Sequence, residues 1–522
     1  MKIALIGLGN FRSSGVHLLH TLLERDGFDV RTFLFKSLAL RATPSEIELL
    51  GDLVGEYEPH LIGVSLLSTF YKLAGTVTRT LRKRSDATIL WGGVHPTVRP
   101  EDCLKHAEIV CIGEGEEAML ELAHAMAAEH KMTGHTIKNL WFNDGDEIVR
   151  NSVRPLLQDL DSLPFPYYLS DNKIFIEANR VLDLKARPDL VEVYDTMTSR
   201  GCPFSCDYCI NYFLRRMYRD KGPYIRRRSV GNVLEELRLA RERYPNLQII
   251  NFNDDVFGLD EKWLEEFCDS YRREIGLPFF CYAHPSAVKD STFKMLKESG
   301  LRNVIMGIQS GSPRVREEFM GRRTPQSKIL ESARILRKYR LRVGYDFIAD
   351  NPYETEDDRR EALELITRLP RPFQLNFFSI GMFPGTRLTD RALRDGVIRL
   401  EDVECMSEKG YELFAGNLHL KRDDELLSWD VLYFLAKLGV PACVLFAIHR
   451  SRFFHKRIRF IVRVMRCLPI DYYGFITYSV HNRLHYLVFR LFCYGRILAR
   501  GDWRFFLKKI ANRILRREDA HL

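Results

Sequence analysis

Three of the chain's eleven cysteines, Cys202, Cys206 and Cys209, stand within one short segment, and the remaining cysteines are scattered. No secretory signal precedes the first apolar run, so a reducing cytoplasm is expected, where a tight cysteine group indicates metal binding rather than a disulfide framework. A structural zinc site needs four ligands, and no fourth Cys or His stands near enough in sequence to complete one. Three thiolates on a 4Fe-4S cluster would instead leave one iron open to a ligand. A zinc site closed by a distant fourth ligand is the alternative.

The spacing of this segment resembles the signature of a large enzyme family. Cys202, Cys206 and Cys209, with the aromatic Tyr208 before the last cysteine, match the Cys-x-x-x-Cys-x-aromatic-Cys pattern of the radical S-adenosylmethionine (SAM) superfamily. The resemblance implies that the amino and carboxylate groups of SAM chelate the open iron. It also implies that an external one-electron reductant drives cleavage of SAM to a 5′-deoxyadenosyl radical, which abstracts hydrogen from an unactivated carbon.

Three later segments resemble further turns of the same family. They are an acidic turn at 253–257, a turn at 307–312 that the family places near the ribose, and a last barrel turn at 383–386. Each would follow the end of a strand, where parallel barrels carry their functional residues. The resemblance assigns SAM contacts to Tyr208, Asp254, Asp255, Gln309 and Ser310.

Two features of these turns leave alternatives open. At 349–355, where relatives carry a glycine-rich turn, this chain has Asp350 and Asn351, which puts the usual backbone contact to the adenine in doubt. Asp254 and Asp255 have a second interpretation, as N-caps of the helix that follows them, because carboxylates accept hydrogen bonds from the free amides at helix starts.

Glycine-containing turns in the first part of the chain predict a ligand at the carboxyl ends of its strands. The turn at 7–9 lacks the third glycine of a dinucleotide fingerprint, and Lys36 rather than an acid follows the second strand, so a nicotinamide site is not favoured. The turns at 65–67, 92–93 and 113–116 form a better set, because glycines let a bulky macrocycle approach the backbone.

These turns, and above all the stretch 91–101, resemble the cobalamin-binding domains attached to radical SAM enzymes. The Asp-x-His-x-x-Gly motif, whose histidine ligates cobalt in other cobalamin proteins, is absent from the first turn, where residues 10–14 read Asn-Phe-Arg-Ser-Ser. A lower axial histidine is therefore not expected from that loop. His95 is a replacement ligand or, as we favour, the cap of a turn. The resemblance assigns cobalamin contacts to Ser65, Leu67, Gly92, Gly93, His95, Glu114 and Gly115.

These turns belong to segments whose hydrophobic periodicity predicts a parallel α/β domain at residues 1–135. Short apolar runs alternate with amphipathic helices, as in a doubly wound, flavodoxin-like (Rossmann-like) sheet with crossover helices. The predicted strands are 2–7, 30–35, 61–67, 88–91 and 109–112, and the predicted helices are 16–23, 47–57, 73–84 and 117–130.

The rest of the chain is predicted as three further parts. Residues 136–190 form a hairpin and a proline-bearing linker. Residues 191–399 return to strand and helix alternation, which suits a partial (β/α)6, TIM-like barrel with the cysteine segment after its first strand. Residues 400–522 lack strand alternation and are predicted as helices. The predicted barrel strands are 193–197, 248–252, 279–282, 303–308, 343–348 and 374–380.

Composition indicates an ordered, soluble chain, since 46% apolar and 28% charged residues exclude wholesale disorder and a polytopic membrane protein. Positive charge gathers late, with 18 Lys and Arg against two acidic residues at 431–517. Aromatic and basic residues mix at 453–460 and 503–509, which fits helices on an anionic membrane surface, a helical cap on the barrel, or a nucleic-acid contact. The membrane interpretation is favoured and nucleic acid is the least favoured. The most apolar run, 438–448, is too short to span a bilayer.

Together these resemblances imply a cytoplasmic, cobalamin-dependent radical SAM enzyme that uses a 4Fe-4S cluster, SAM and cobalamin. Its expected reaction is methyl transfer to an unactivated carbon or phosphorus of a small-molecule or lipid substrate. One SAM would methylate the cobalamin and a second would supply the radical. A lipid or isoprenoid substrate, and peripheral contact at the inner face of the membrane, follow from the basic tail alone.

Two alternatives remain at this stage. The first is a radical cyclisation, ring rearrangement or oxidation without methyl transfer, and the second is a non-catalytic iron–sulfur or cobalamin carrier. No catalytic acid or base is assigned, because Tyr208, Tyr282 and Tyr345 fall beside barrel strands, where aromatic side chains usually pack.

Overall fold

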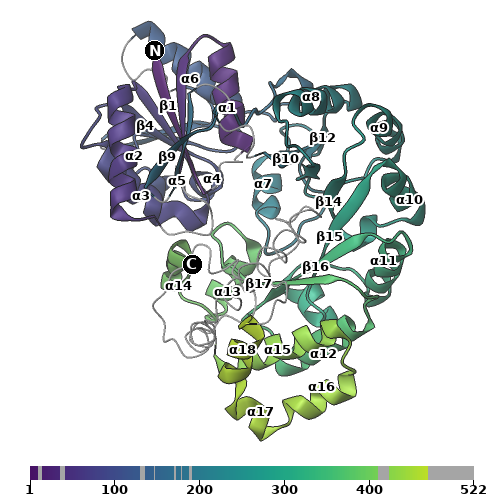
Figure 1. The fold of residues 1–522 in the computed structure, drawn as a ribbon. Helices are drawn as coiled ribbons and strands as arrows, with labels where there is room; N and C mark the ends of the chain where they lie inside the picture. Colours follow the sequence, from purple (N-terminus) through teal and green to yellow (C-terminus); the bar gives the residue numbers. More distant parts are fainter. Residues whose placement is uncertain are drawn as a thin grey trace, which may run out of the picture.

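A computed structural model describes residues 1–9, 14–35, 42–129, 136–145, 147–169, 172–177, 179–186, 191–409 and 423–467. Within these residues the chain forms two α/β units, followed by a group of helices (Figure 1). The first unit, drawn in purple, holds a sheet between helical layers. The second, drawn in teal and green, is a curved sheet with helices along its outer side.

A nine-stranded sheet in the order β7-β6-β5-β4-β3-β1-β2-β8-β9 forms the centre of the first unit. The five predicted strands are confirmed as β1 to β5, which are parallel and mostly apolar, as expected for strands covered on both faces. The strand order reverses between β1 and β3, the position at which doubly wound sheets bind ligands. The bounds are β1 Lys2–Leu8, β2 Asp29–Phe35, β3 Leu61–Ser65, β4 Thr88–Gly92 and β5 Ile109–Cys111.

Helices cover both faces of this sheet. Neighbouring residues of β1 show the division, since Leu5 belongs to the apolar core shared with α1 and α6, and Ile6 to the core shared with α2 and α3. Thr43 starts α2 with a capping box, in which its side chain and that of Glu46 bond each other's backbone amides. The helix bounds are α1 Ser14–Arg25, α2 Pro44–Tyr57, η1 Ser68–Phe70, α3 Tyr71–Leu81, α4 Val94–Val98, α5 Pro100–Cys103 and α6 Glu116–Glu129.

Two hairpins extend the sheet beyond the five predicted strands. The predicted hairpin, β6 Leu140–Asn143 and β7 Ile148–Arg150, pairs antiparallel to β5. The second hairpin, β8 Lys173–Glu177 and β9 Arg180–Asp183, pairs through β8 with the free edge of β2. The sequence did not indicate this second hairpin, because such short edge strands are placed by backbone pairing and carry little hydrophobic pattern.

The second unit is a six-stranded parallel sheet whose strands follow one another in sequence order. All six predicted runs are confirmed as strands, and helices α8 to α12 lie along the outer side (Figure 1). The strands are β10 Val193–Thr196, β13 Ile249–Phe252, β14 Phe279–Ala283, β15 Leu301–Gln309, β16 Arg342–Ala349 and β17 Gln374–Ser379. The helices are α7 Asn211–Met217, α8 Val230–Arg243, α9 Glu261–Glu274, α10 Asp290–Ser299, α11 Gln326–Lys338, α12 Glu356–Arg368 and α13 Arg387–Arg394.

The helices after the barrel contact both units. Helix α14 returns to the first unit and lies against η1 and α3, whereas α15 packs on α12. Tyr433 of α15 stacks on Phe377 of β17 with ring centroids 4.7 Å apart, so this helix packs on the last strand of the barrel. The bounds are α14 Leu400–Lys409, α15 Asp424–Leu438, α16 Ala442–His449, α17 Arg452–Lys456 and α18 Ile458–Cys467.

The aromatic and basic segment at 453–460 falls on α17 and α18, and the one at 503–509 lies outside the described residues. Phe453 and Phe460 are 71% and 56% exposed, so the cap interpretation does not account for them. Among the helices that the structure describes, none combines the length and the apolar character that crossing a bilayer requires.

We expect Phe252→Ala to destabilise the second unit by about 3 kcal/mol or more, because it empties the centre of an aromatic cluster. The ring of Phe252 contacts those of Phe257, Phe267 and Phe279, and its side chain is fully buried. Urea unfolding followed by circular dichroism measures the change. Phe453→Ala is the matched control and should shift stability by less than about 0.5 kcal/mol, as exposed positions do; equal losses in both variants would contradict this packing.

Candidate functional site

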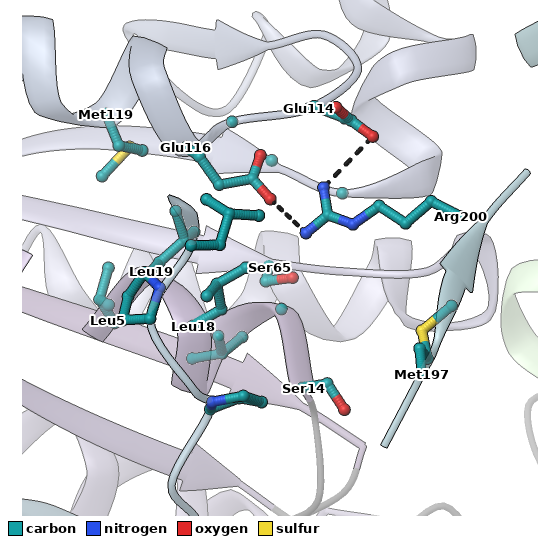
Figure 2. Close-up of a pocket in the computed structure, with 18 of the residues that line it drawn as sticks. Leu5, Ser14, Leu18, Leu19, Ser65, Glu114, Glu116, Met119, Met197 and Arg200 are labelled. Carbon is teal, nitrogen blue, oxygen red and sulfur yellow. Dashed lines mark hydrogen bonds and ion pairs between the residues drawn. The ribbon is translucent and has the colours of Figure 1, made fainter. Parts of the chain in front are cut away.

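A cavity of about 420 Å³ lies between the two units (Figure 2). One wall comes from α1 and from the turns after β3, β4 and β5, and the other from the linker at 160–166 and from residues 196–200. Its floor is apolar, with Leu5 and Leu90 of the sheet and Met119 of α6. The residues that were predicted to contact cobalamin and that line the cavity are Ser65, Gly92, Gly93, Glu114 and Gly115.

Glycines leave this wall open, and the backbone requires one of them, Gly93. Gly93 has a φ of +103°, and a Cβ there would lie 2.8 Å from the carbonyl oxygen of Leu66. Gly92 and Gly115 add two more positions without side chains beside Ser65. A broad, flat macrocycle such as a corrin can approach a wall of this kind closely, so the residues present fit the predicted cofactor.

Two of the predicted cobalamin contacts, Leu67 and His95, are not among the residues that line the cavity. The Nδ1 atom of His95 lies 3.0 Å from the hydroxyl of Ser68, and its ring packs on Tyr71 with centroids 4.6 Å apart. Burial lowers the pKa of His95 to about 4, so the imidazole is neutral. Residues 10–13 of the first turn lie outside the described residues, and Ser14 lines the cavity.

Ion pairs tie the cavity wall of the first unit to the second. Arg200, the residue before the cysteine segment, reaches Glu116 at 2.7 Å and Glu114 at 3.2 Å, as Figure 2 shows. Arg226 pairs with Glu114 at 2.7 Å, and the amide of Glu114 donates to the hydroxyl of Tyr218 at 2.8 Å. Burial would raise the pKa of Glu114, but the two arginines outweigh it and hold this pKa below its usual range. Neither arginine could be predicted as a partner of Glu114, because residues so distant in the chain form no motif.

The cysteine segment forms a tight turn after β11 (Ser199–Arg200), which pairs with β12 (Arg226–Arg227). The amide of Cys209 donates to the carbonyl of Cys206 at 3.0 Å. Two side chains donate to sulfurs: Arg322 reaches Cys206 Sγ at 3.7 Å and Asn211 reaches Cys209 Sγ at 3.6 Å. Donors to the sulfurs stabilise thiolates that hold an iron–sulfur cluster, so this loop fits the predicted cofactor.

Within the described ranges, no three His, Cys, Asp or Glu side chains surround a point where one metal ion could sit. The described part of the chain therefore shows no closed zinc site at the cysteine segment. A four-iron cluster is wider than a single ion, since each thiolate binds a different iron, and it does not need the sulfurs to converge on one point.

The two aspartates predicted to contact SAM lie differently. Asp254 is buried and accepts hydrogen bonds from the amide of Thr198 at 3.0 Å, from its hydroxyl at 2.7 Å, and from Ser199. Asp255 accepts from Asn211 at 3.3 Å, beside Cys209. Neither caps the following helix: the N-cap of α9 is Asp260, which accepts from the amide of Trp263, so the N-cap interpretation is wrong.

The remaining predicted SAM contacts gather where β15 ends beside the cysteine segment. Gln309 has a φ of +73° at the last position of β15, and Ser310 is buried directly after it. The hydroxyl of Tyr208 lies 3.5 Å from Arg322, which also donates to the carbonyl of Gly307. Arg322, which the sequence analysis missed, therefore connects the cysteine segment to the end of β15.

The unusual turn after β16 is held by polar contacts of its own. Asp350 has a φ of +62° and accepts a hydrogen bond from the hydroxyl of Ser379 at the end of β17. Asn351 is buried, and its side-chain oxygen accepts from the amide of Tyr353 at 3.2 Å. The two residues that replace the usual glycines thus stabilise this turn.

Comparison with known proteins agrees with this architecture. Residues 196–366 match the family model of the radical SAM superfamily, and residues 9–123 match that of the B12 binding domain. The chain is 27% identical over 387 residues to an uncharacterized methyltransferase of Pyrococcus horikoshii, covering 72% of this chain and 77% of the relative. It is 24% identical over 330 residues to the anaerobic magnesium-protoporphyrin IX monomethyl ester cyclase of Cereibacter sphaeroides, covering 61% of this chain and 51% of the relative.

Two solved structures share the fold. The radical SAM methyltransferase TsrM from Kitasatospora setae, solved with a tryptophan substrate and a SAM analogue, has a TM-score of 0.60 and is 18% identical over 76% of each chain. The cobalamin-dependent SAM radical enzyme OxsB, solved with aqua-cobalamin, has a TM-score of 0.62 and is 14% identical over 98% of this chain and 80% of its own.

The fold and the site define an α/β enzyme in which a doubly wound cofactor domain stands against a partial parallel barrel with a cysteine loop. The chain carries a radical SAM domain, matched at residues 196–366, and an N-terminal B12-binding domain, matched at residues 9–123. Its cofactors are accordingly a 4Fe-4S cluster, SAM and cobalamin.

We expect Arg200→Leu to lower the free energy of unfolding by about 3 kcal/mol, because it leaves Glu114 and Glu116 together without the cation between them. Cobalamin binding, followed by absorbance titration, should weaken as well, since both carboxylates line the cavity. Arg82→Leu is the control: Arg82 pairs with Glu108, both more exposed, and such pairs contribute less than about 1 kcal/mol. Unchanged stability and unchanged cobalamin affinity in Arg200→Leu would contradict the role of this interface.

Proposed function

We propose that this enzyme transfers a methyl group from SAM to an unactivated carbon of its substrate. The observation that carries the proposal is the glycine-lined cavity, which lies against the strand that leads into the cysteine segment. A cobalamin in that cavity and a cluster on that segment would both be close to the carboxyl ends of the barrel strands. The methyltransferase names of the Pyrococcus relative and of TsrM support the proposal.

In this proposal each set of side chains has one task. Cys202, Cys206 and Cys209 hold the cluster, with Arg322 and Asn211 donating to its sulfur ligands. Tyr208, Asp255, Gln309 and Ser310 line the position for SAM, and Asp254 supports it by fixing residues 198 and 199. Ser65, Gly92, Gly93, Glu114 and Gly115 hold cobalamin. When bound, the cluster and SAM supply a radical, and cobalamin supplies the methyl group.

The second candidate is a radical cyclisation or oxidation without methyl transfer, and the cyclase name of the Cereibacter relative favours it. Both candidates use the same cysteines and the same barrel, so the fate of the SAM methyl group is what separates them. A carrier without turnover, the third interpretation, requires neither an open iron nor a barrel.

We expect the anaerobically reconstituted and reduced enzyme to form 5′-deoxyadenosine from SAM, and Cys206→Ala to form none, because the cluster loses one of its three ligands. Cys268→Ala, at a buried cysteine of α9 away from the segment, is the control and should retain formation. SAM labelled in its methyl group then separates the candidates by mass spectrometry. A product without label would favour cyclisation or oxidation, and absence of 5′-deoxyadenosine from a fully loaded enzyme would favour the carrier.

We further propose that the enzyme is cytoplasmic and contacts the inner face of the membrane through α17 and α18, and that its substrate is a lipid or isoprenoid. The exposed rings of Phe453 and Phe460 support this contact, and Arg452, Lys456 and Arg457 are exposed beside them. Aromatic side chains enter the acyl boundary while cations bind anionic headgroups, which is the pattern of interfacial helices.

Vesicle sedimentation tests this contact. We expect binding to phosphatidylglycerol vesicles and little to phosphatidylcholine vesicles, and we expect Phe453→Ser with Phe460→Ser to weaken binding about tenfold or more, since two apolar rings leave the lipid. Val397→Ser, an exposed apolar position far from these helices in sequence, is the control. Equal sedimentation with both lipids, or no sedimentation at all, would count against the contact and against the lipid substrate.

A further inference from the structure

At one layer of the sheet the inner face of the barrel carries polar side chains, whereas the outer face is apolar. Along β15, β16 and β17, the residues that pack into the outer core alternate with residues that do not: Met306, Tyr345 and Leu375 belong to that core. The residues next to them in the chain therefore face the interior, because successive side chains of a strand point to opposite sides. Three of these inward residues, Gly307, Asp346 and Asn376, stand at paired positions across the three strands.

Asp346 is a half-buried carboxylate with only part of its hydrogen-bonding capacity used. Asn376 donates to its Oδ1 atom at 2.8 Å, and among the described residues its Oδ2 atom has no hydrogen bond or ion pair. Burial raises the pKa of Asp346 to about 7, against the opposing effects of Asn376 and Arg322. The second oxygen of Asp346 is therefore available to a ligand that donates a hydrogen bond.

Tyr282 of β14 is the second inward group without a partner. Its phenol makes no hydrogen bond to any described residue, although its side chain is half-buried. Burial raises the pKa of Tyr282, and the negative charges of Asp346 and Asp195 add to the effect. The two carboxylates are thus close enough to the phenol for their charges to interact with it. The sequence predicts packing for Tyr282, and its ring does contact that of Phe280, with ring centroids 6.2 Å apart, but the phenol oxygen has no hydrogen-bond partner among the described residues.

Structural carboxylates elsewhere in the second unit are satisfied in a way that Asp346 is not. Glu236 accepts from Tyr194 at 2.8 Å and Thr196 at 2.9 Å and pairs with Arg228, and Asp254 accepts from three donors. Arg322 is the cation whose charge lowers the pKa of Asp346. Its guanidinium instead donates to Cys206 Sγ and to the carbonyl of Gly307, and it forms no ion pair with Asp346. A purely structural role therefore does not account for the open oxygen of Asp346.

The interior site lies beside the cysteine segment. Gly307, paired with Asp346 in the sheet, accepts from the same guanidinium that donates to Cys206 Sγ at 3.7 Å. A Cβ at position 307 would lie 2.4 Å from the side-chain nitrogen of Gln309, so a larger residue there would displace that side chain. Arg322 thus bridges from the cluster ligand to the strand layer that contains Asp346.

We propose that Asp346 and Tyr282 form a substrate subsite that holds a hydrogen-bond donor, a hydroxyl or an ammonium group, near the carbon to be modified, with Asn376 positioning the carboxylate. The inference rests on the proposed function and narrows it: the part of the substrate that enters the barrel is polar. A lipid substrate would enter by its hydroxyl or amine end. The same donor chemistry could come from SAM itself, through its ribose or its amino group, and the experiment separates these two sources.

The first test replaces Tyr282 with 3-fluorotyrosine in the enzyme loaded with cluster, cobalamin and SAM, and follows the fluorine resonance. We expect ethanolamine, which carries both donors, to shift the resonance, and 1,2-dimethoxyethane, which has none, to leave it unchanged. In Asp346→Asn, the ethanolamine concentration that produces half of the full shift should rise about tenfold, because a hydrogen bond to a charged group is lost. Asp290→Asn, at an exposed carboxylate paired with Lys338, is the control. Equal shifts with both probes, or no effect of Asp346→Asn, would overturn the subsite.

Equilibrium dialysis of SAM separates the two sources of the donor. We expect SAM to bind wild type, Asp346→Asn and Tyr282→Phe within about twofold of one another, because the subsite faces the substrate. Weaker SAM binding to both variants, with no ethanolamine shift once SAM is bound, would assign the donor to SAM and overturn the substrate role. Retained cluster absorbance in both variants shows that they are folded.

Product analysis completes the test. With methyl-labelled SAM and a small-molecule extract of the source cells, we expect the labelled product to bear a hydroxyl or amine, and Asp346→Asn to lose this product while 5′-deoxyadenosine still forms. A labelled product without any such group would overturn the subsite and leave methyl transfer intact. An unlabelled product would overturn methyl transfer, and the fluorine experiment would still decide the subsite, since it needs no turnover.

Discussion

The relative position of the two cofactor sites depends on one buried charge cluster. Glu114 lies in the turn that closes the cobalamin-binding sheet, and it is paired with Arg226 and Arg200, which belong to the two short strands flanking the cysteine segment. Unpaired charges at such an interface are costly in free energy. The ion pairs therefore stabilise this one alignment of the two units. The cavity wall and the strand leading to Cys202 are set by the same contacts.

Much of the architecture could be predicted because it follows from the hydrophobic pattern of short segments of the sequence. Buried parallel strands are continuous apolar runs, so β1 to β5 of the nine-stranded first sheet and all six strands of the second could be placed from the sequence. The cysteine spacing located the cluster loop. The hairpin β8–β9 could not, since its position depends on the free edge of β2. Arg200 and Arg322 were missed for a related reason: each acts on a partner more than eighty residues away, and no local spacing encodes such a contact.

For the two aspartates after β13 and the histidine after β4, residue type alone suggests a role that the side chain does not have in the structure. Asp254 and Asp255 were possible caps by residue type, but the path of the loop makes Asp260 the N-cap of α9, while Asp254 accepts hydrogen bonds from residues 198 and 199. His95 sits in a stretch that resembles cobalamin domains, yet its ring packs on Tyr71 and does not line the cavity. Orientation in these cases follows from backbone geometry that composition does not reveal.

The return of α14 to η1 and α3 has a mechanical consequence. The first unit is joined to the barrel by the chain that leads into β10 and again by the helix that leaves the barrel after α13, so the two units are fastened at two separated points. The ion pairs of Glu114 with Arg200 and Arg226 add a further connection beside the cavity. Wide separation of the two units to admit a large cofactor would therefore break the contact of α14 and these ion pairs together.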